Sequence, residues 1–581
     1  MRFSKNILNL LGMFFVVIRL FHRWVLAYLL RLDMPMYRVR ATHGLRVPMS
    51  DGVQLAVDHY HPRQPGQFPT ILIRSPYGRR PRASVFGWLL TFMAHRFAER
   101  GYHVIVQDVR GRFDSSGIFK PYFNEERDGL ETIRWITRQP WYGGCIAMWG
   151  HSYLGIVQLV LAGKSPELKA ISPTITGSDM RSVLYPDGAF DLGLALRWVG
   201  VLEWLHHARN GMVSRLQAAL RAPMMWLQLE RQIKPAFDHL PLRECDQVAF
   251  GHTVDFYQDW LARTDADDPI WQEARQSIRL AEAQVPAHFI SGWYDFFLRQ
   301  LLADYETMRR SGAKPYLTIG PWHHFDAMIR MVDLRAGLRW FDTYLKGRSD
   351  KLRSEPVRLY VMGAQAWHDF PMWPPDAKVK PFYLNEQERL STVPPAVREA
   401  SSEFTYDPAH PTPALGGAQF TPNGAGQRDN RKLEARPDVL TFTTLPLEQP
   451  LDVIGYVRLR LYVETSSQQV DFFGRLCDVY PDGRSMNVCD GLVRVRPGTG
   501  ESTRDNITCV EIDLWATAYR FLSGHAIRLQ VSGGAHPRWN RNTGTGEFLK
   551  EGRTLPSVRQ VVRHDVTYAS ALFLPIILLK S

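Results

Sequence analysis

Between residues 37 and 175, short apolar runs alternate with segments of helical pattern. Strand-like residues on both sides of the turn signal Ser50-Asp51-Gly52 predict a hairpin over 45–57. Beyond it, strand runs and helical segments take turns, at 70–73, 92–100, 103–107, 125–137 and 146–149. Strands that alternate with helices are typical of a parallel, doubly wound sheet. We therefore expect an α/β domain in this part of the chain.

Residues 181–280 have a different pattern, without strand runs. Their helical stretches, at 192–206 and 212–229, are rich in Trp, Leu and Met. The β/α pattern then resumes, with strand runs at 287–292 and 316–320 and a final helical segment at 332–345. A helical block between two parts of one sheet pattern predicts a cap inserted into the α/β domain.

After Gly347 the helical pattern nearly disappears. Runs of β composition separated by Gly, Pro, Asn and Asp predict an all-β sandwich of jelly-roll size, with a long polar loop at 416–431. The runs lie at 357–362, 439–442, 453–463, 491–495, 509–514 and 527–531. The expected division of the chain is an N-terminal segment at 1–33, the α/β domain at 34–180 and 281–349, the cap at 181–280, and the sandwich at 350–581.

The N-terminal segment, residues 1–33, stands apart from the rest. Its apolar run Leu8–Ile18 is shorter than the twenty or so residues a membrane span needs. No A-x-A-like cleavage site follows, as a signal peptide would require. Arg19, Arg23 and Arg31 fall at helical multiples of four, opposite aromatic and aliphatic residues. This favours an amphipathic helix on an anionic membrane surface and a cytoplasmic protein at the inner membrane. A helix docked on its own protein, an exported protein and a membrane anchor stay open.

Composition narrows the function classes. A chain of 581 residues is too long for one core, and its 45% hydrophobic residues are ordinary for a globular enzyme. Five scattered cysteines without a C-x-x-C pair predict reduced thiols, not disulfides or a zinc site. The net charge of +12 favours anionic substrates or membrane surfaces. Because the arginines are dispersed and no nucleic-acid motif accompanies them, we expect no nucleic-acid role.

A candidate nucleophile follows the strand run at 146–149. The sequence Gly150-His151-Ser152-Tyr153-Leu154-Gly155 joins this run to an apolar helical segment at 156–162. A serine on a tight strand-to-helix turn is the nucleophile elbow of α/β-hydrolases, and the helix start directs N–H groups at an anion beside it. The second glycine comes one place later than in G-x-S-x-G. The motif alone therefore fits a serine in an ordinary Gly-flanked turn equally well.

The partners of a catalytic serine are a histidine and an orienting carboxylate, in the chain order Ser, Asp or Glu, His. Asp295 follows the strand run at 287–292, and His324 follows the run at 316–320. Each has an ordinary structural interpretation, Asp295 as a helix cap and His324 as a packed ring. A metallohydrolase site built on His323, His324 and Asp326 is a weaker alternative, because no third histidine has ligand spacing nearby.

Several linked motifs resemble one family. They are Arg-Ser-Pro-Tyr-Gly at 74–78, Asp-Val-Arg-Gly with Ser116-Gly117 at 108–117, Gly-His-Ser-Tyr-Leu-Gly at 150–155, Gly-Trp-Tyr-Asp at 292–295, Gly-Pro-Trp-His-His at 320–324 and Pro-Arg-Trp-Asn-Arg-Asn at 537–542. Together they resemble the cocaine esterase/X-prolyl dipeptidyl-peptidase family of α/β-hydrolases, which includes glutaryl-cephalosporin acylases and α-amino acid ester hydrolases. The resemblance implies an inserted helical cap, a C-terminal jelly roll and no cofactor.

The resemblance also implies roles for particular residues. His324 would be the base, the Tyr77 hydroxyl and the Tyr153 N–H would hold the oxyanion, and Ser152 would attack. The expected function is a serine hydrolase that cleaves an ester or amide acyl group of a small molecule through an acyl-enzyme. The alternative is a membrane-associated binding protein that uses its β-sandwich and keeps an inactive triad. We also expect Asp108 and Arg110 to form a buried ion pair that supports the site.

Overall fold

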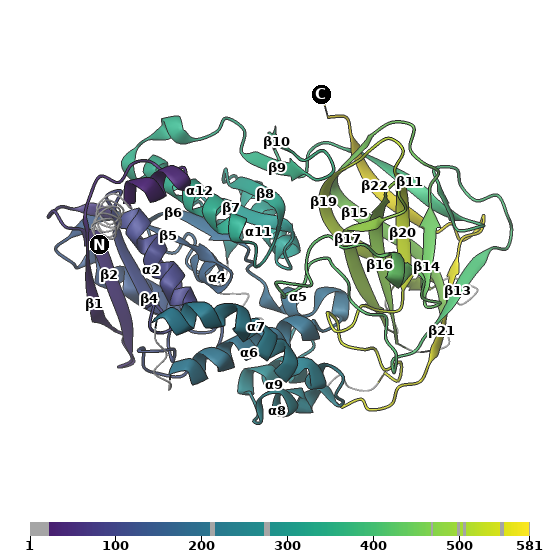
Figure 1. Cartoon of the computed structure of the whole chain (residues 1–581), viewed down its shortest axis with the longest axis horizontal. Coiled ribbons are helices and arrows are strands. Elements are labelled where there is room, and N and C mark those ends of the chain that lie inside the picture. The colour runs from purple at the N-terminus through teal and green to yellow at the C-terminus, as the bar shows by residue number, and fades with distance from the viewer. Residues whose placement is uncertain are drawn as a thin grey trace, which may run out of the picture.

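The structure is a computed structural model that describes residues 23–209, 215–271, 279–465, 467, 469–496, 500–502, 507–546 and 551–579. Figure 1 shows two β-rich bodies side by side, with a group of helices along one edge between them. The N-terminal body holds the sheet predicted from the alternating pattern. The C-terminal body is a β-sandwich.

The N-terminal sheet has ten strands within the described residues, in the order β1-β2-β4-β3-β5-β6-β7-β8-β9-β10. The strands are β1 (Val39–Pro48), β2 (Gln54–Pro62), β3 (Phe68–Ser75), β4 (His103–Asp108), β5 (Tyr142–His151), β6 (Leu168–Thr174), β7 (His288–Tyr294), β8 (Tyr316–His323), β9 (Val357–Val361) and β10 (Ala366–Phe370). In this order, the strands from β4 to β9, β3 included, run parallel, and the flanking pairs are antiparallel. The hairpin and the doubly wound sheet are confirmed.

Helices cover both faces of this sheet, as its apolar strands require. Every residue of β4 and β7 is buried, which is typical of parallel strands covered on both sides. The covering helices are α2 (Val85–Ala98), α3 (Glu125–Thr137), α4 (Tyr153–Leu159), α11 (Leu298–Arg310) and α12 (Ala327–Lys346). Helices α2 and α12 begin earlier than predicted because Ser84 and Asp326 cap them, each accepting a backbone N–H.

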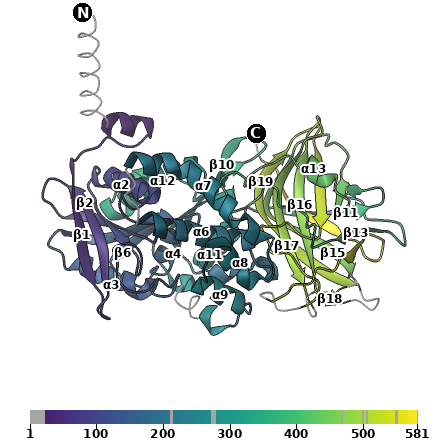
Figure 2. The same ribbon diagram turned by 60° about the horizontal axis from the view of Figure 1, so that its bottom comes forward.

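The predicted cap is inserted between β6 and β7. It consists of α5 (Met180–Leu184), α6 (Leu192–Arg209), α7 (Arg215–Phe237), α8 (Cys245–Phe250) and α9 (Asp255–Ala262), with 3-10 turns at Pro186–Gly188, Leu242–Glu244 and Leu280–Glu282. Figure 2 shows these helices gathered between the sheet and the sandwich. The cap is therefore placed to cover the carboxyl ends of the parallel strands.

The C-terminal body is an antiparallel sandwich. Its strands are β11 (Lys378–Asn385), β12 (Arg389–Ser391), β13 (Ser401–Tyr406), β14 (Val439–Thr443), β15 (Leu451–Thr465), β16 (Val470–Val479), β17 (Ser485–Val495), β18 (Glu501–Ser502), β19 (Thr508–Phe521), β20 (Ala526–Ser532), β21 (Val558–Arg563) and β22 (Ala571–Ile577), with the short helix α13 (Arg431–Glu434) and a 3-10 turn at Ser349–Lys351. The sandwich is confirmed, but the run at 357–362 is not part of it. That run forms β9, which pairs in parallel with β8 and extends the first sheet.

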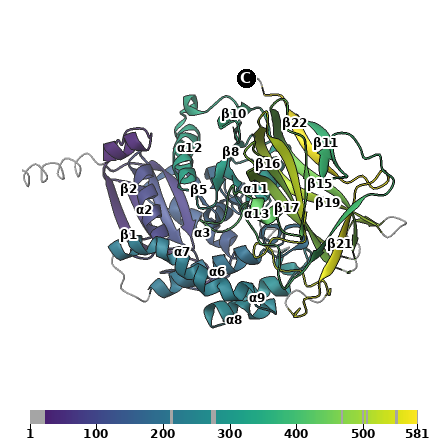
Figure 3. The same cartoon turned by 45° about the vertical axis from the view of Figure 1, so that its right-hand side comes forward.

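Backbone hydrogen bonds at two places help to attach the sandwich to the rest of the chain. Met362, just after β9, exchanges backbone hydrogen bonds with Ala518 and Arg520 of β19. The motif at 537–542 reaches the cap, where Gly193 N–H donates to the Arg538 carbonyl and Asn540 N–H donates to the Phe190 carbonyl. Figure 3 shows the sandwich against α11 and the cap helices. The C-terminal motif is therefore a connection between two bodies.

The N-terminal segment is described only from Arg23 onward, so the apolar run Leu8–Ile18 lies outside the described residues. Residues 23–29 are helical and pack on the α/β body through Ala27, which is fully buried. The Arg23 guanidinium lies over the Trp24 ring, 4.0 Å from its centroid, so the expected separation of arginine and aromatic faces does not hold there. Within the part of the chain that the structure describes, no helix is long and apolar enough to cross a membrane.

Candidate active site

Ser152 occupies a strained turn between β5 and α4. Its backbone has φ 57° and ψ −122°, a region that a non-glycine residue rarely adopts and that clusters at functional sites. The turn is held in place because Ser152 N–H donates to the Thr174 carbonyl at 2.9 Å. This geometry is that of a nucleophile elbow, with the hydroxyl at the carboxyl end of the sheet.

The two flanking glycines allow this turn for different reasons. A side chain at Gly150 would collide with Leu154, the second residue of α4. A Cβ at Gly155 would lie 2.5 Å from side-chain atoms of Thr176, which follows β6. The displaced second glycine is thus required by the close approach of α4 to the segment after β6.

His324 and Asp295 form a hydrogen-bonded pair. The His324 Nδ1 lies 2.7 Å from Asp295 Oδ2, and both side chains are buried. The other carboxylate oxygen accepts the Phe297 N–H at 2.9 Å. Because Asp295 accepts from Nδ1, the imidazole keeps Nε2 available for a proton from another group.

Ser152 and His324 line the same cavity. Among the described residues, no hydrogen bond joins the two side chains, whereas the His324–Asp295 bond is formed. The neighbouring His323 points elsewhere, and its Nδ1 accepts the Phe325 N–H at 3.2 Å. The residues that the structure describes contain no cluster of three or more His, Cys, Asp or Glu side chains able to hold a metal ion. The two histidines therefore do not converge on one site.

Tyr77 faces the same cavity from the loop after β3. Its hydroxyl accepts the Trp198 indole N–H at 3.0 Å, and the side chain lines this cavity together with Ser152. Burial raises the pKa of Tyr77, so the side chain remains a phenol at neutral pH. Since an indole only donates, the phenol hydrogen of Tyr77 stays available for an acceptor beside Ser152.

The backbone around Tyr77 is fixed by three hydrogen bonds. Tyr77 N–H donates to Ser75 Oγ at 3.1 Å, and the Ser84 hydroxyl donates to the Tyr77 carbonyl. Arg112 Nε donates to the Pro76 carbonyl at 3.1 Å. The motif at 108–117 therefore holds the loop that carries Tyr77.

Tyr153 follows Ser152 at the first position of α4, where a backbone N–H has no acceptor within the helix. Its buried side chain anchors this helix start. The Tyr153 hydroxyl donates to Glu125 Oε1 at 2.7 Å and accepts the Tyr122 N–H at 3.1 Å. Glu125 in turn pairs with Arg74 at 2.9 Å. The direction of the Tyr153 N–H is thus fixed from α3 and β3.

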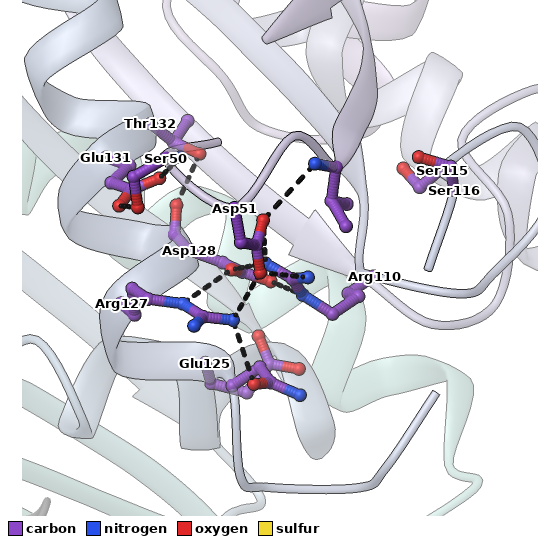
Figure 4. A network of polar contacts seen from close by, with 12 residues as sticks. Ser50, Asp51, Arg110, Ser115, Ser116, Glu125, Arg127, Asp128, Glu131 and Thr132 are labelled. Carbon is purple, nitrogen blue, oxygen red and sulfur yellow. Dashed lines mark hydrogen bonds and ion pairs between the residues drawn. The ribbon is translucent and has the colours of Figure 1, made fainter. Parts of the chain in front are cut away.

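The expected ion pair between Asp108 and Arg110 is wrong. Asp108 pairs with Arg79, and Arg110 pairs with Asp128 at 2.6 Å and with Asp51 at 2.7 Å. Figure 4 shows Arg110 directed at these two aspartates. Each of the two residues therefore has its own counter-charge, and both ion pairs hold the loop after β4.

Two cavities flank Ser152. The first is lined by aliphatic and aromatic side chains and by one arginine: Phe86, Leu89, Leu90, Val201, Phe325, Phe420 and Arg330. The second has a wholly uncharged lining, including Met180, Leu184, Leu194, Trp260, Phe296 and Phe297. Tyr77, Ser152 and Trp198 line both. A substrate bound across Ser152 would place one group in each cavity.

Sequence reasoning missed several contributors to this site. Trp198 belongs to the cap helix α6, and no motif marks it. Phe420 belongs to the loop at 416–431, predicted as polar, yet its ring lies 5.5 Å from that of His324. Asp333 on α12 pairs with His151, the residue before the serine, with 2.8 Å between Asp333 Oδ2 and His151 Nε2. The sequence signal within this loop was its apolar residues Ala418 and Phe420, which the structure shows to be buried.

Comparisons with known proteins follow the same division of the chain. The family model for X-Pro dipeptidyl-peptidase (S15 family) matches residues 51–326, and that for the X-Pro dipeptidyl-peptidase C-terminal non-catalytic domain matches residues 350–572. Cocaine esterase from Rhodococcus sp. (strain MB1 Bresler) is 34% identical over 547 residues, covering 87% of this chain and 93% of that enzyme.

Solved structures share the fold over nearly the whole length. An aminopeptidase from a marine sediment archaeon of the Thaumarchaeota has a TM-score of 0.78 at 23% identity, covering 94% of this chain and 97% of its own. An α-amino acid ester hydrolase has a TM-score of 0.76 at 24% identity, and the match covers 93% of this chain and 97% of that hydrolase. None of these relatives supports the alternative of a binding protein without activity.

Proposed function

This chain belongs to the cocaine esterase/X-prolyl dipeptidyl-peptidase family of α/β-hydrolases, and on that premise we propose that Ser152, His324 and Asp295 are its catalytic triad. The protein is a serine hydrolase that cleaves an ester or amide acyl group of a small molecule through an acyl-enzyme. The assignment of roles to residues, and the nature of the acyl group, are our proposals.

The reaction begins when Ser152 Oγ attacks the substrate carbonyl carbon while His324 Nε2 takes the hydroxyl proton. Asp295 keeps Nδ1 protonated and stabilises the imidazolium. The carbonyl oxygen becomes an oxyanion that accepts from the Tyr77 hydroxyl and the Tyr153 N–H. Collapse of this intermediate releases the alcohol or amine, which takes the proton from His324. Water then repeats the sequence on the acyl-enzyme and releases the acid.

One observation carries this proposal. A strained serine elbow, a buried histidine–aspartate pair and a phenol donor come from four separate segments and meet at one cavity. A serine in an ordinary glycine-flanked turn would have no reason to share a cavity with such a pair. A glycine would adopt the positive φ at position 152 without strain. Packing alone therefore does not explain why a serine stands there.

Kinetics of single variants tests the assignment. Ser152→Ala and His324→Ala should each lower kcat for an activated ester such as 4-nitrophenyl butyrate by on the order of 10⁴ or more. Because triad members act as one unit, the double variant should be no slower than either single variant. Ser182→Ala, on α5 in the cap, is the matched control and should keep normal turnover. A double variant slower than both singles by the product of their effects would contradict the triad.

The substrate groups that meet Ser152 are apolar in our proposal. Apart from Arg330 and the polar groups beside Ser152, the cavity linings are aliphatic and aromatic, and burying apolar groups there contributes roughly 25 cal/mol per Å² of apolar surface. A group with an aromatic or branched hydrocarbon part buries more apolar surface in either cavity than a short, wholly polar one. Cocaine esterase, the relative named above, supports an ester as the bond cleaved.

We propose further that the N-terminal segment holds the enzyme at an anionic membrane surface on the cytoplasmic side. The helix at 23–29 leaves Val25, Tyr28 and Leu29 exposed. A pocket beside it is lined by five arginines and two aspartates, Arg31, Arg100, Arg335, Arg339, Arg348, Asp33 and Asp342. Exposed apolar side chains next to surplus positive charge match the interface of an anionic bilayer.

A further inference from the structure

Arg330 is the only charged side chain besides histidine among the described residues that line the first cavity beside Ser152. It lies in the first turn of α12, directly after the loop that carries His324. A cation there is opposed by the helix dipole, and the acidic residue at this helix end, the N-cap Asp326, uses a carboxylate oxygen on the Met328 N–H. The helix dipole therefore does not explain why an arginine stands at this position.

The guanidinium of Arg330 has no protein partner in the part of the chain that the structure describes. No hydrogen bond, ion pair or cation–π contact joins it to another described residue. Burial alone lowers its pKa, without an opposing carboxylate. The nearest acidic neighbour on its helix, Asp333, uses its oxygens on His151 at 2.8 Å and on Thr174 at 2.9 Å. Arg330 thus faces the cavity unpaired.

The same cavities contain no negative charge. No Asp or Glu occurs among the described residues that line either of them. A charge that leaves water needs a counter-charge or several hydrogen bonds. A substrate ammonium group would find neither here and would meet Arg330 instead. A substrate anion would find an arginine whose planar fork matches a carboxylate with two parallel hydrogen bonds.

We propose that Arg330 is a specificity residue that binds a carboxylate of the substrate, so that the preferred ester is anionic and carries no free amine. This inference rests on the proposed function, since it takes Ser152 as the nucleophile. It narrows the substrate class to acyl esters with a carboxylate in the group that enters the first cavity. The net charge of +12 would draw such anions toward the protein.

Paired substrates test the proposal in the full-length enzyme. One pair places the carboxylate on the acyl side, as 4-nitrophenyl hydrogen glutarate against its methyl ester. The other places it on the leaving side, as 4-acetoxybenzoate against its methyl ester. For each pair, the kcat/KM of the carboxylate substrate is divided by that of its methyl ester. This ratio is then compared between wild type and Arg330→Met, so that the intrinsic reactivity of the two esters cancels. Arg134→Met, which removes an exposed arginine on α3, is the matched control.

We expect Arg330→Met to lower kcat/KM for the carboxylate member of one pair by about 10- to 100-fold, mainly through KM. Its methyl ester should change by less than about threefold. Arg330→Lys should keep part of the preference, and Arg134→Met all of it. The pair that responds tells whether the first cavity takes the acyl or the leaving group. Ratios that are equal in wild type and Arg330→Met for both pairs would overturn the proposal.

A second measurement uses only the wild-type enzyme, so it does not depend on the folding of a variant. Glutarate and benzoate should inhibit hydrolysis of 4-nitrophenyl butyrate competitively, at least tenfold more strongly than their methyl esters. Glycyl-prolyl 4-nitroanilide, with its free ammonium group, should be the poorest substrate. Equal inhibition by acids and methyl esters would overturn the role of Arg330 while leaving the triad intact. If the wild-type enzyme did not hydrolyse 4-nitrophenyl butyrate at all, that result would instead contradict the proposed function.

Discussion

Tyr77→Phe tests how the oxyanion is held. The substitution removes one oxygen atom, and that oxygen has two roles. It accepts the Trp198 N–H at 3.0 Å, and it lines the cavity beside Ser152, where the oxyanion forms in our proposal. The ring itself, packed 5.1 Å from that of Phe86, keeps its contacts in the variant. The change therefore acts on hydrogen bonding alone.

The two roles predict effects of different size on folding and on turnover. Leaving the Trp198 N–H without an acceptor in a buried site should cost about 1–3 kcal/mol of unfolding free energy. Losing a donor to the oxyanion should cost about 2.7–4 kcal/mol in the transition state, a fall of 10²–10³ in kcat. KM should change little, because the donor acts where charge develops and not on the ground-state carbonyl.

The assay measures kcat and KM for 4-nitrophenyl butyrate together with denaturant unfolding of the same preparation. Trp198→Phe is the informative companion, since it removes the indole N–H but keeps the phenol of Tyr77. It should lower stability similarly and kcat by only about tenfold. A Tyr77→Phe enzyme with near-normal kcat would refute the reasoning and leave an oxyanion hole made of backbone donors alone.

Three further predictions address other parts of the account. Asp295→Asn should lower kcat by about 10⁴ with KM unchanged, because the amide turns the wrong tautomer of His324 toward Ser152; a fall of less than tenfold would exclude Asp295 as the orienting residue. Gly155→Ala should lower the unfolding free energy by about 1–3 kcal/mol and kcat at least tenfold, because the new Cβ would lie 2.5 Å from Thr176. Adding Thr176→Gly should restore part of both quantities. An unchanged kcat in Gly155→Ala would show that the elbow tolerates a shifted α4. Deleting residues 1–33 should leave ester hydrolysis intact but abolish salt-sensitive sedimentation with phosphatidylserine vesicles, and equal sedimentation with and without the segment would rule out its membrane role.

Residues that are adjacent in a motif could be placed from the sequence. The elbow at Ser152 and the loops after β7 and β8 follow from strand ends and chain order, so Asp295 and His324 could be proposed as partners. The strand at 357–361 could not be assigned to its sheet, because its composition suits either body and only pairing with β8 decides. The partners of Asp108 and Arg110 depend on which way each side chain leaves the loop, which one sequence does not show.

Contributors from distant segments escaped sequence reasoning for a physical reason. Trp198, Phe420 and Arg330 reach the site from the cap, from a sandwich loop and from the start of a helix. Each looks ordinary within its own segment, as a core aromatic or a surface arginine. Only the three-dimensional packing brings them to one cavity beside Ser152.

The central claim is that Ser152 is the nucleophile that carries the acyl group. Its most direct test is the site of covalent labelling in the wild-type enzyme by a fluorophosphonate probe, located by mass spectrometry of its peptides. The account predicts one adduct, on the peptide that contains Ser152, and its loss in Ser152→Ala. An adduct on another serine, or an active enzyme that stays unlabelled, would contradict it.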